Sequence, residues 1–273
     1  MSDMIIISEH RVGSRWMHYL FAGMLNRGPS PEMDGDKLYL PENRKQMIQY
    51  LKHDRIPKLH HATPNQVIEA AKLACSEFKY PGNLKVLGIV RHPRDRTVSF
   101  SFHQRYHKRK YDASQDKEYL FEQTFETDKE AMRYTAIDSA WNRRENVRQI
   151  ELMLDGFSTE YYNNNYNNRE HFKTFPYIWT TYERLKEDTV REVKILCDFF
   201  QHPTPDLVIA QAVKEHSFKN KSGRAAGEEN KSDEWRRKGV VSDWENHFDS
   251  EMVARTQFVT DIYQNIIDRN FNL

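Results

Sequence analysis

The sequence predicts a single-domain α/β fold, in which helices flank a central parallel sheet of the phosphate-loop-like, nucleotide-binding type. Residues 5–8 and 85–90 are almost continuously apolar, as strands buried on both faces should be. Apolar residues at helical spacing follow the first of these strands, which makes a strand, turn and helix unit. The chain has no internal repeat and no convincing linker, so we expect one domain across residues 1–273.

Strands and helices are expected to alternate along most of the chain. The strands are predicted at residues 5–8, 56–61, 85–90 and 175–181. The helices are predicted at residues 13–25, 42–53, 63–77, 94–108, 117–134, 137–155, 182–200, 204–215 and 249–269. Ligands of open parallel sheets bind beyond the carboxyl ends of the strands, so polar residues that follow each strand should converge there.

Three segments are expected to be excursions from this framework. Residues 26–57 are polar and carry several prolines, and we expect them to cover one end of the sheet. Residues 103–175 contain the run YYNNNYNN, which predicts a flexible surface loop at 161–168. Residues 219–235 are charged and poor in apolar side chains, which is typical of a mobile loop.

The composition excludes several classes of protein. The 41 Lys and Arg residues balance 40 Asp and Glu residues, so no overall field attracts nucleic acid or an anionic membrane. Cys75 and Cys197 lie far apart without metal-type spacing, which suits free thiols in a reducing compartment. The chain shows no signal-peptide pattern and no membrane-spanning run, so we expect a cytoplasmic protein.

The first candidate site is the turn in IIISEHRVGSRW. Backbone N–H groups from Gly13 onward open a helix, where unpaired donors and the helix dipole favour an anion. Ser14 adds a hydroxyl, and Arg11 and Arg15 add positive charge. The pattern G-x-x-x-x-G-K-[ST] is absent, however, and a serine N-cap with two solvated arginines explains the same residues.

The second candidate site is VRHPRDRTVSFSFHQR. Arg91 ends a strand, and the following helix would bring the hydroxyl of Ser99 towards its guanidinium, so that both bind one phosphate. The alternative is that Arg91 pairs with Asp95 while Ser99 only caps or packs.

The third candidate site is EWRRKGVVSDW. Its basic residues next to Gly239 could fold over an anion, with Trp235 and Trp244 as anchors, although a bare charge run is usually solvated surface. Three candidate anion-binding segments in one nearly neutral protein make each of the three predictions stronger.

Together these stretches resemble the sulfotransferase family that uses 3′-phosphoadenosine 5′-phosphosulfate (PAPS), in its cytosolic and bacterial members. EHRVGSRW is similar to the 5′-phosphosulfate loop Y-P-K-S-G-T-T-W, which implies contacts from Arg11, Val12, Gly13, Ser14, Arg15 and Trp16. RHPRDRTVS is similar to the 3′-phosphate motif R-N-P-K-D-V-x-V-S, which implies contacts from Arg91 and Ser99. RRKGVVSDWENHF is similar to R-K-G-x-x-G-D-W-K-x-x-F, which implies contacts from Arg237, Lys238 and Gly239.

Shorter matches extend the resemblance over residues 5 to about 248. YERL is similar to Y-E-D-[ML], which implies that Tyr182 lies near the adenine. HSFK is similar to T-S-F-K, which implies that Phe218 packs against the adenine with Ser217 nearby. PKLHH is similar to K-T-H-L-P, which implies that Lys58 is the active-site lysine and His60 the catalytic histidine.

Several residues depart from the family patterns. Arg11 replaces a lysine, Ser14 and Arg15 replace two threonines, and Ser242 replaces a glycine. The second histidine, at position 61, leaves the base open, because a shift of one residue in strand register would turn it inward instead. The dimerisation signature K-x-x-x-T-V-x-x-x-E is absent, so the oligomeric state is also open.

The resemblance implies a sulfotransferase mechanism in which the protein chiefly positions reactants and stabilises charge. Arg11 and Lys58 would neutralise charge on the leaving phosphate and the moving sulfuryl group. His60 would take the proton from a hydroxyl or amine of the acceptor. PAPS is the expected co-substrate and adenosine 3′,5′-bisphosphate (PAP) the product, and no metal is expected because fixed cations handle the transferred group.

The acceptor is expected to be a small molecule or saccharide, shaped by residues 26–57, 103–175 and 219–235. The role of Arg15 is open, because it could reach the sulfuryl group, pair with an acidic neighbour such as Glu9, or face an anionic acceptor. A phosphate-loop kinase is disfavoured, because the sequence lacks G-K-[ST] and an obvious acidic magnesium ligand after a strand. A non-catalytic nucleotide-binding relative would keep the 3′-phosphate contacts without needing His60 or Lys58.

Overall fold

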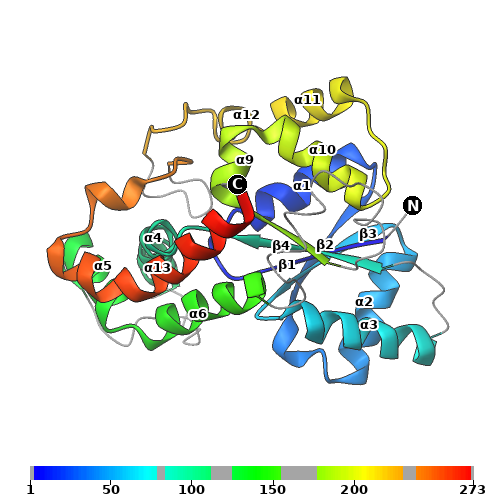
Figure 1. Cartoon of the computed structure of the whole chain (residues 1–273), viewed down its shortest axis with the longest axis horizontal. Helices are drawn as coiled ribbons and strands as arrows, with labels where there is room; N and C mark the ends of the chain where they lie inside the picture. Colours follow the sequence, from blue (N-terminus) through cyan, green and yellow to red (C-terminus); the bar gives the residue numbers. More distant parts are fainter. Residues whose placement is uncertain (1–2, 79–83, 112–124, 155–176, 230–237, 272–273) are drawn as a thin grey trace.

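A central sheet of five parallel strands organises the chain, in the order β2-β3-β1-β4-β5 (Figure 1). The computed structural model describes residues 3–78, 84–111, 125–154, 177–229 and 238–271. The strands are β1 (Asp3–Ser8), β2 (Gly28–Asp34), β3 (Arg55–His60), β4 (Leu84–Val90) and β5 (Tyr177–Thr181). The predicted α/β fold with a central parallel sheet is confirmed.

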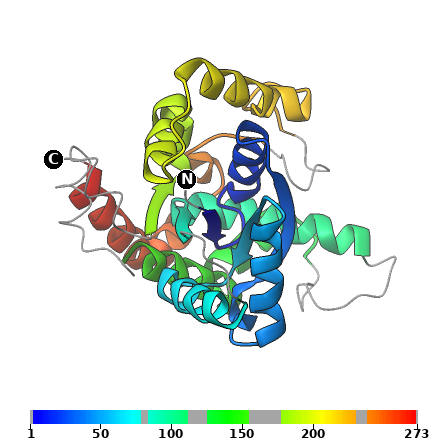
Figure 2. The same cartoon turned by 90° about the vertical axis from the view of Figure 1, so that its right-hand side faces the viewer.

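Helices cover both faces of the sheet (Figures 1 and 2). One face carries α1 (Ser14–Met24), α10 (Thr189–Phe199) and α11 (Asp206–Glu215). The other carries α2 (Pro41–Lys52) and α3 (Pro64–Phe78). Within the part of the chain that the structure describes, no helix combines the length and apolar character needed to cross a bilayer.

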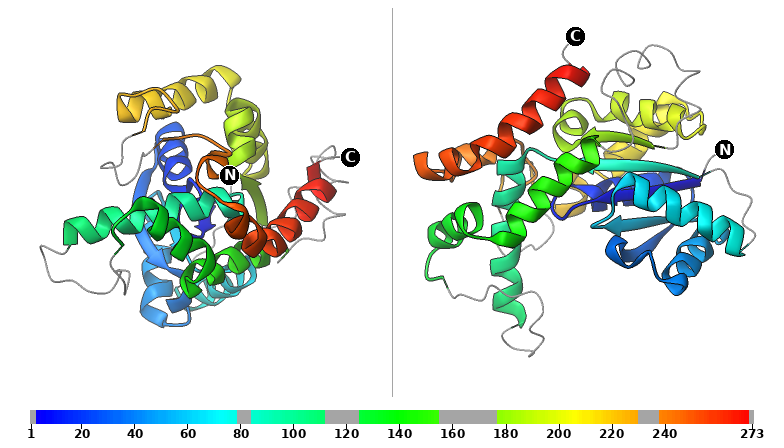
Figure 3. Two further views of the ribbon diagram at one scale, coloured as in Figure 1. Left: turned by 90° about the vertical axis from the view of Figure 1, so that its left-hand side faces the viewer. Right: turned by 60° about the horizontal axis from the view of Figure 1, so that its bottom comes forward.

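A further group of helices lies beyond the carboxyl end of β4 (Figures 1 and 3). It contains α4 (Pro93–Tyr111), α5 (Asp128–Ile137), α6 (Ala140–Leu154) and α13 (Ser250–Phe271). A separate apolar cluster that includes Val98, Met132 and Met252 joins α4, α5 and α13. This group forms a wall next to the edge of the sheet where the predicted site residues lie.

The central strands form because their side chains are apolar on both faces. Residues Met4, Ile5, Ile6 and Ile7 of β1 are completely buried, and β4 is buried along almost its whole length. Continuous burial is expected of a parallel strand that helices cover on both sides. The core therefore fixes where β1 and β4 end, and those ends carry the turns that bear Arg11 and Arg91.

The expectation that residues 26–57 lie outside the sheet is wrong for β2. Pro29 and Pro31 argue against a strand, because proline cannot donate to the ladder. The strand forms nonetheless at the edge of the sheet, where only β3 pairs with it, and its register shifts between Pro29 and Glu32. Buried and exposed side chains also alternate only weakly along β2, since only Ser30 and Met33 of this strand are buried.

Two helix predictions and one loop prediction differ from the structure. The helix predicted at 117–134 begins at Asp128, because Thr127 and Glu130 form a capping box there, while residues 112–124 lie outside the described residues. The single helix predicted to residue 200 is two helices, α9 (Tyr182–Glu187) and α10, because Asp188 caps a new helix. The loop predicted at 219–235 begins inside α12 (Phe218–Ser222).

The other predicted helices lie close to observed helices, and two predicted loop segments are untested. The helices predicted at 137–155 and 249–269 correspond to α6 and α13, and the one predicted at 42–53 corresponds to α2. The loop predicted at 161–168 lies outside the described residues, as do residues 230–235.

Gly88 offers a test of packing in the sheet. A Cβ on Gly88 would collide with the hydroxyl of Tyr177 and lie 2.6 Å from Cδ2 of Leu152. We expect Gly88→Ala to lower the free energy of unfolding by about 1–3 kcal/mol, measured by urea denaturation, because the buried strands leave no room. Leu207→Ala, at a side chain that is 79% exposed, should change it by less than about 0.5 kcal/mol.

The collision itself is tested by adding Tyr177→Phe, which removes the nearest atom. The double variant should be more stable than the sum of the two single effects predicts, because the new methyl group then replaces the hydroxyl. Strict additivity of the two substitutions would show that the Gly88 effect has another origin.

Candidate functional site

The predicted site residues converge on one cavity of about 460 Å³ at the carboxyl edge of the sheet. It is lined by residues from the ends of β1, β3 and β4, from α9 and from the segment after residue 238. The predicted residues among its lining are Arg11, Gly13, Ser14, Arg15, Trp16, Lys58, His60, Arg91, Ser99, Tyr182, Phe218, Lys238 and Gly239.

The turn between β1 and α1 exposes backbone donors to this cavity. Arg11 and Gly13 both have left-handed backbones, with φ of 71° and 86°. Gly13 precedes the first residue of α1 and provides no side-chain cap for the helix. A Cβ at Gly13 would lie 2.6 Å from Cδ2 of Tyr182, so glycine is needed for both its conformation and its close packing. The helix start therefore keeps its N–H groups available for an anion.

Arg91 links this turn to two other segments. Its guanidinium donates to the carbonyl of Arg11 at 3.3 Å and to the carbonyl of Val240 at 3.0 Å. The same group stacks on the ring of Tyr182, with 4.4 Å between the guanidinium carbon and the ring centroid. Ser99 accepts a hydrogen bond from Nε of Arg11 at 3.1 Å. The first two predicted motifs are thus in direct contact.

The third motif is held in place by α4. The carboxylate of Asp95 accepts the backbone N–H of Ser242 at 2.6 Å and that of Trp244 at 3.1 Å. The alternative partner considered for Arg91, Asp95, therefore anchors the segment that carries Lys238 and Gly239. A Cβ at Gly239 would collide with the ring of Phe218, so this backbone packs directly on the predicted adenine contact.

Two buried donors in the cavity wall lack hydrogen-bond partners among the described residues. They are Nε of Arg91 and Nε1 of Trp16. Buried donors are normally paired, so these two are suited to acceptor oxygens of a bound ligand. Together with the uncapped start of α1, they fit a phosphorylated ligand.

Glu32 is the centre of a charged cluster at the other end of the cavity. It lies opposite Lys58 in the register of β2 and β3, and its Oε1 accepts from Nζ of Lys58 at 2.8 Å. Arg15 donates to the same oxygen at 2.9 Å. Oε2 of Glu32 lies 3.2 Å from Nε2 of His60. Arg15 therefore pairs with Glu32 rather than with Glu9.

Burial and charge act against each other in this cluster. Burial raises the pKa of Glu32, but the hydrogen bond to His60 and the charge of Lys58 outweigh it and hold that pKa below its ordinary value. Burial lowers the pKa of Lys58 and of His60, although Glu32 opposes both shifts. At neutral pH, Glu32 is therefore ionised and His60 is neutral.

The tautomer of His60 follows from its partners. Nδ1 lies 3.0 Å from the carbonyl oxygen of Ser8, which can only accept, so Nδ1 carries the proton. Nε2 lies 3.2 Å from both Nζ of Lys58 and Oε2 of Glu32, so it accepts from Lys58 in the neutral ring and donates to Glu32 when it is protonated. Such an imidazole can take up a proton at Nε2.

The neighbouring histidine has a different orientation. β3 ends at His60, and His61 has a left-handed backbone with φ of 60°. Its Nδ1 lies 2.8 Å from Oε2 of Glu9, and it is not among the residues that line the cavity. Of the two histidines that the sequence left open, His60 is the one that faces the cavity.

A family model described as a sulfotransferase domain matches residues 1–269. The chain belongs to this family. It is also 38% identical over 100 residues to flavonol 3-sulfotransferase from Flaveria bidentis, a match that covers 31% of this chain and 32% of that protein. The match thus spans about a third of the length of that curated relative.

Solved structures share the fold of this family member. A mouse sulfotransferase (SULT7A1) complexed with PAP has a TM-score of 0.56 and 17% identity, over 99% of this chain and 85% of that one. Retinol dehydratase in complex with androsterone and PAP has a TM-score of 0.51 and 16% identity, over 97% and 80%. At these identities the likeness supports the fold alone.

Two predicted contacts of this sulfotransferase-family chain are not part of the cavity lining, and a third is not described by the structure. The side chain of Val12 is fully buried in the core. The hydroxyl of Ser217 accepts the N–H of Asn220 at 3.3 Å and caps α12. Arg237 lies outside the described residues, so its predicted role is untested.

Several lining residues were not predicted from the sequence. Glu32 was missed because β2 was not recognised as a strand, and it is a single acidic residue in a polar segment. The others are His10, Tyr19, Lys186, His216, Lys221 and Val240. Lys186 follows the YERL match by one residue, so its position next to that motif was the available signal.

A double-mutant cycle tests the pairing of Glu32 with Lys58. The ammonium of Lys58 is almost completely buried, so Glu32→Gln leaves it without its counter-ion. We expect a coupling energy of about 1–3 kcal/mol between Glu32→Gln and Lys58→Met in urea denaturation at pH 7. The matched pair Glu69 and Lys72 is exposed and should couple by less than about 0.5 kcal/mol. Equal coupling in the two pairs would contradict a buried, charge-balanced cluster.

Proposed function

We propose that this protein is a PAPS-dependent sulfotransferase, which moves a sulfuryl group to a hydroxyl or amine of a small-molecule or saccharide acceptor. One observation carries the proposal. Three anion-binding segments meet through Arg91 at one end of a cavity, and His60 and Lys58 line the same cavity. A ligand that carries phosphates at two positions beside a reacting group would contact all of these segments at once.

The residues available for the donor fall into three groups. The uncapped start of α1, with Arg11 and Ser14, would hold the 5′-phosphosulfate. Arg91, Ser99 and Lys238 would hold the 3′-phosphate, for which Nε of Arg91 is an available donor. Trp16, Tyr182 and Phe218 offer aromatic surfaces for the adenine.

PAPS would supply the sulfuryl group, which is bonded to a phosphate that is a good leaving group. Arg11 and Lys58 would stabilise negative charge on the leaving phosphate, because both are cations fixed by neighbouring groups. His60 would accept the acceptor's proton at Nε2, since Nδ1 is already protonated against Ser8. Glu32, 3.2 Å from Nε2, would then accept a hydrogen bond from the imidazolium and stabilise it.

The acceptor is identified only by class. The cavity is also lined by Tyr19 and by His103, whose polar groups suit a hydroxylated ligand. Turnover of PAPS with a panel of alcohols, phenols, amines and saccharides would identify it.

Two other functions make different demands on the site. A phosphate-loop kinase would need the G-K-[ST] lysine and an acidic magnesium ligand, and the turn after β1 carries Arg11 and a single glycine instead. A non-catalytic nucleotide-binding protein would not need the buried Lys58 and His60 beside the ligand. The buried charge of Lys58 and the unprotonated Nε2 of His60 beside it favour an enzyme.

Calorimetry with nucleotides tests the donor specificity. PAP should bind at least about tenfold more tightly than ATP or 5′-AMP, because only PAP carries the 3′-phosphate that Arg91 and Ser99 would contact. Arg91→Lys should remove most of that preference, because lysine cannot reproduce the forked contacts. Equal affinity for PAP and ATP in the unmodified protein would contradict the proposal.

Turnover of variants tests the base. His60→Ala should reduce kcat by about 10²–10⁴-fold while its affinity for PAP stays within about twofold, since His60 would act on the acceptor. Glu32→Gln should have a smaller effect, because Glu32 would act through His60. A larger loss of kcat in Glu32→Gln than in His60→Ala would make Glu32 the base, and normal turnover in His60→Ala would rule His60 out.

A further inference from the structure

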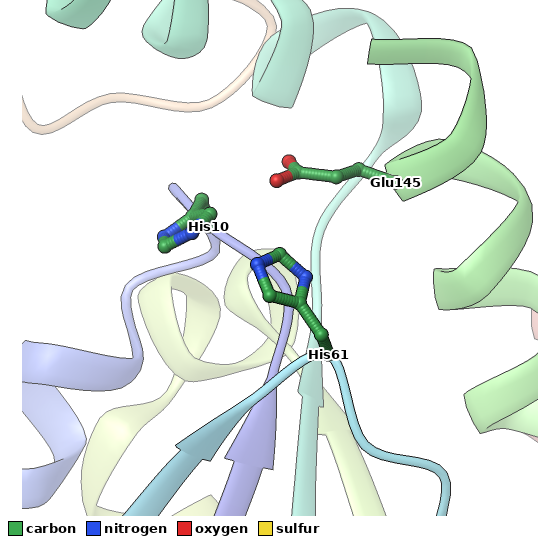
Figure 4. A group of neighbouring side chains, drawn as sticks. All are labelled: His10, His61 and Glu145. Carbon is green, nitrogen blue, oxygen red and sulfur yellow. The ribbon is translucent and has the colours of Figure 1, made fainter. Parts of the chain in front are cut away.

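Three potential metal ligands meet behind the wall of the cavity. His10 belongs to the turn after β1, His61 follows β3, and Glu145 belongs to α6. One donor atom from each lies within 4.8 Å of the other two, and Figure 4 shows the three side chains pointing toward a common space. Only His10 also lines the cavity. The group is therefore distinct from the sulfuryl-transfer site but shares a residue with its wall.

His61 is held in the orientation of a metal ligand. Its Nδ1 lies 2.8 Å from the carboxylate of Glu9, which is 2% exposed. The carboxylate accepts, so Nδ1 carries the proton and Nε2 has a free lone pair. A carboxylate on the outer nitrogen of a metal-bound histidine is a frequent arrangement, because it fixes the ring and increases its basicity.

Glu145 is held in a comparable way. It is 1% exposed, and one of its oxygens, Oε2, forms an ion pair with the fully buried guanidinium of Arg96. Its other oxygen, Oε1, is buried and accepts no hydrogen bond of normal geometry among the described residues, although the indole of Trp141 lies close enough to lower the pKa of Glu145. Buried carboxylate oxygens are normally paired, so Oε1 is suited to a further ligand.

The donor set also fits the charge and geometry of a divalent transition metal. Zinc binds imidazole nitrogen and carboxylate oxygen at about 2.0–2.2 Å, which in a tetrahedron separates the donors by roughly 3.4 Å. The donors lie within 4.8 Å of one another and would move closer together on binding the ion. Burial raises the pKa of Glu145 to about 7 although the charge of Arg96 opposes this shift, so a bound metal ion would displace a proton from this carboxyl group.

We propose that His10, His61 and Glu145 bind a zinc ion. Glu9 orients His61, and Arg96 orients Glu145. Two histidines and one glutamate leave one tetrahedral position for a water molecule. The ion joins the turn that carries Arg11 to the end of β3 and to α6. It therefore fixes the relative positions of Arg11 and His60, whose ring lies 4.2 Å from that of His10. The site does not depend on the identity of the sulfuryl donor or acceptor.

The test measures zinc binding directly. Protein stripped with EDTA is titrated with Zn²⁺ in competition with a chromophoric chelator, and with Co²⁺, whose visible absorption reports tetrahedral coordination. We expect one tightly bound equivalent of Zn²⁺ and a rise in Tm of roughly 5–10 °C at a hundredfold excess over Kd. Mg²⁺, which prefers six oxygen ligands, should neither bind nor raise Tm.

Variants separate this site from incidental binding. His10→Ala and His61→Ala should each weaken zinc binding by at least about 100-fold, and Glu9→Gln by about 10–100-fold through the orientation of His61. The control His53→Ala removes an exposed histidine that follows α2 and should bind as the unmodified protein does. His10→Gln replaces His10→Ala where the alanine variant fails to fold.

The proposal is wrong if the stripped protein binds no zinc. It is equally wrong if binding persists unchanged in both histidine variants, or if Mg²⁺ competes at similar concentrations.

Discussion

The position of Arg91 governs the whole candidate site. One half-buried guanidinium just after β4 donates to the carbonyls of Arg11 and Val240 and stacks on Tyr182. These contacts join segments that are 80 and 149 residues away in the chain. Because β4 is buried along nearly all its length, the position of Arg91 is fixed by the core. The ligand-binding turns are therefore aligned by the sheet, while Nε of Arg91 is left without a partner among the described residues and available to a ligand.

A second constraint is the balance of charge around Glu32. The site gathers cations that would repel one another in a buried space, and the carboxylate on the edge strand β2 offsets Arg15 and Lys58 together. An anionic donor would take over part of this role, because its oxygens compete with Glu32 for the same cations. Glu32 then remains beside His60, the residue that would accept the proton of the acceptor under the proposed function. The same carboxylate thus stabilises the cluster without ligand and, under the proposed function, would support proton transfer with it.

The parts of the site that lie in contiguous motifs were predictable from the sequence. Arg91 directly follows a buried strand, Arg11 lies in the turn after another, and Lys238 precedes a glycine, so local patterns identified them. Glu32 was not predictable, because its strand has two prolines and is recognisable only by its pairing with β3. The cluster of His10, His61 and Glu145 comes from three distant segments, and no spacing in the sequence indicates it. Asp95 was considered as a partner of Arg91, yet only the fold shows that it holds Ser242 and Trp244.

The central idea is that three distant segments contact one ligand at the same time. Hydrogen–deuterium exchange of the full chain with saturating PAP, compared with saturating 5′-AMP, measures this directly. PAP should slow exchange together in residues 11–16, at the start of α4 and in residues 238–244. 5′-AMP, which lacks the 3′-phosphate, should protect mainly residues 11–16. Protection by PAP that is confined to one of the three segments would contradict a shared site organised by Arg91.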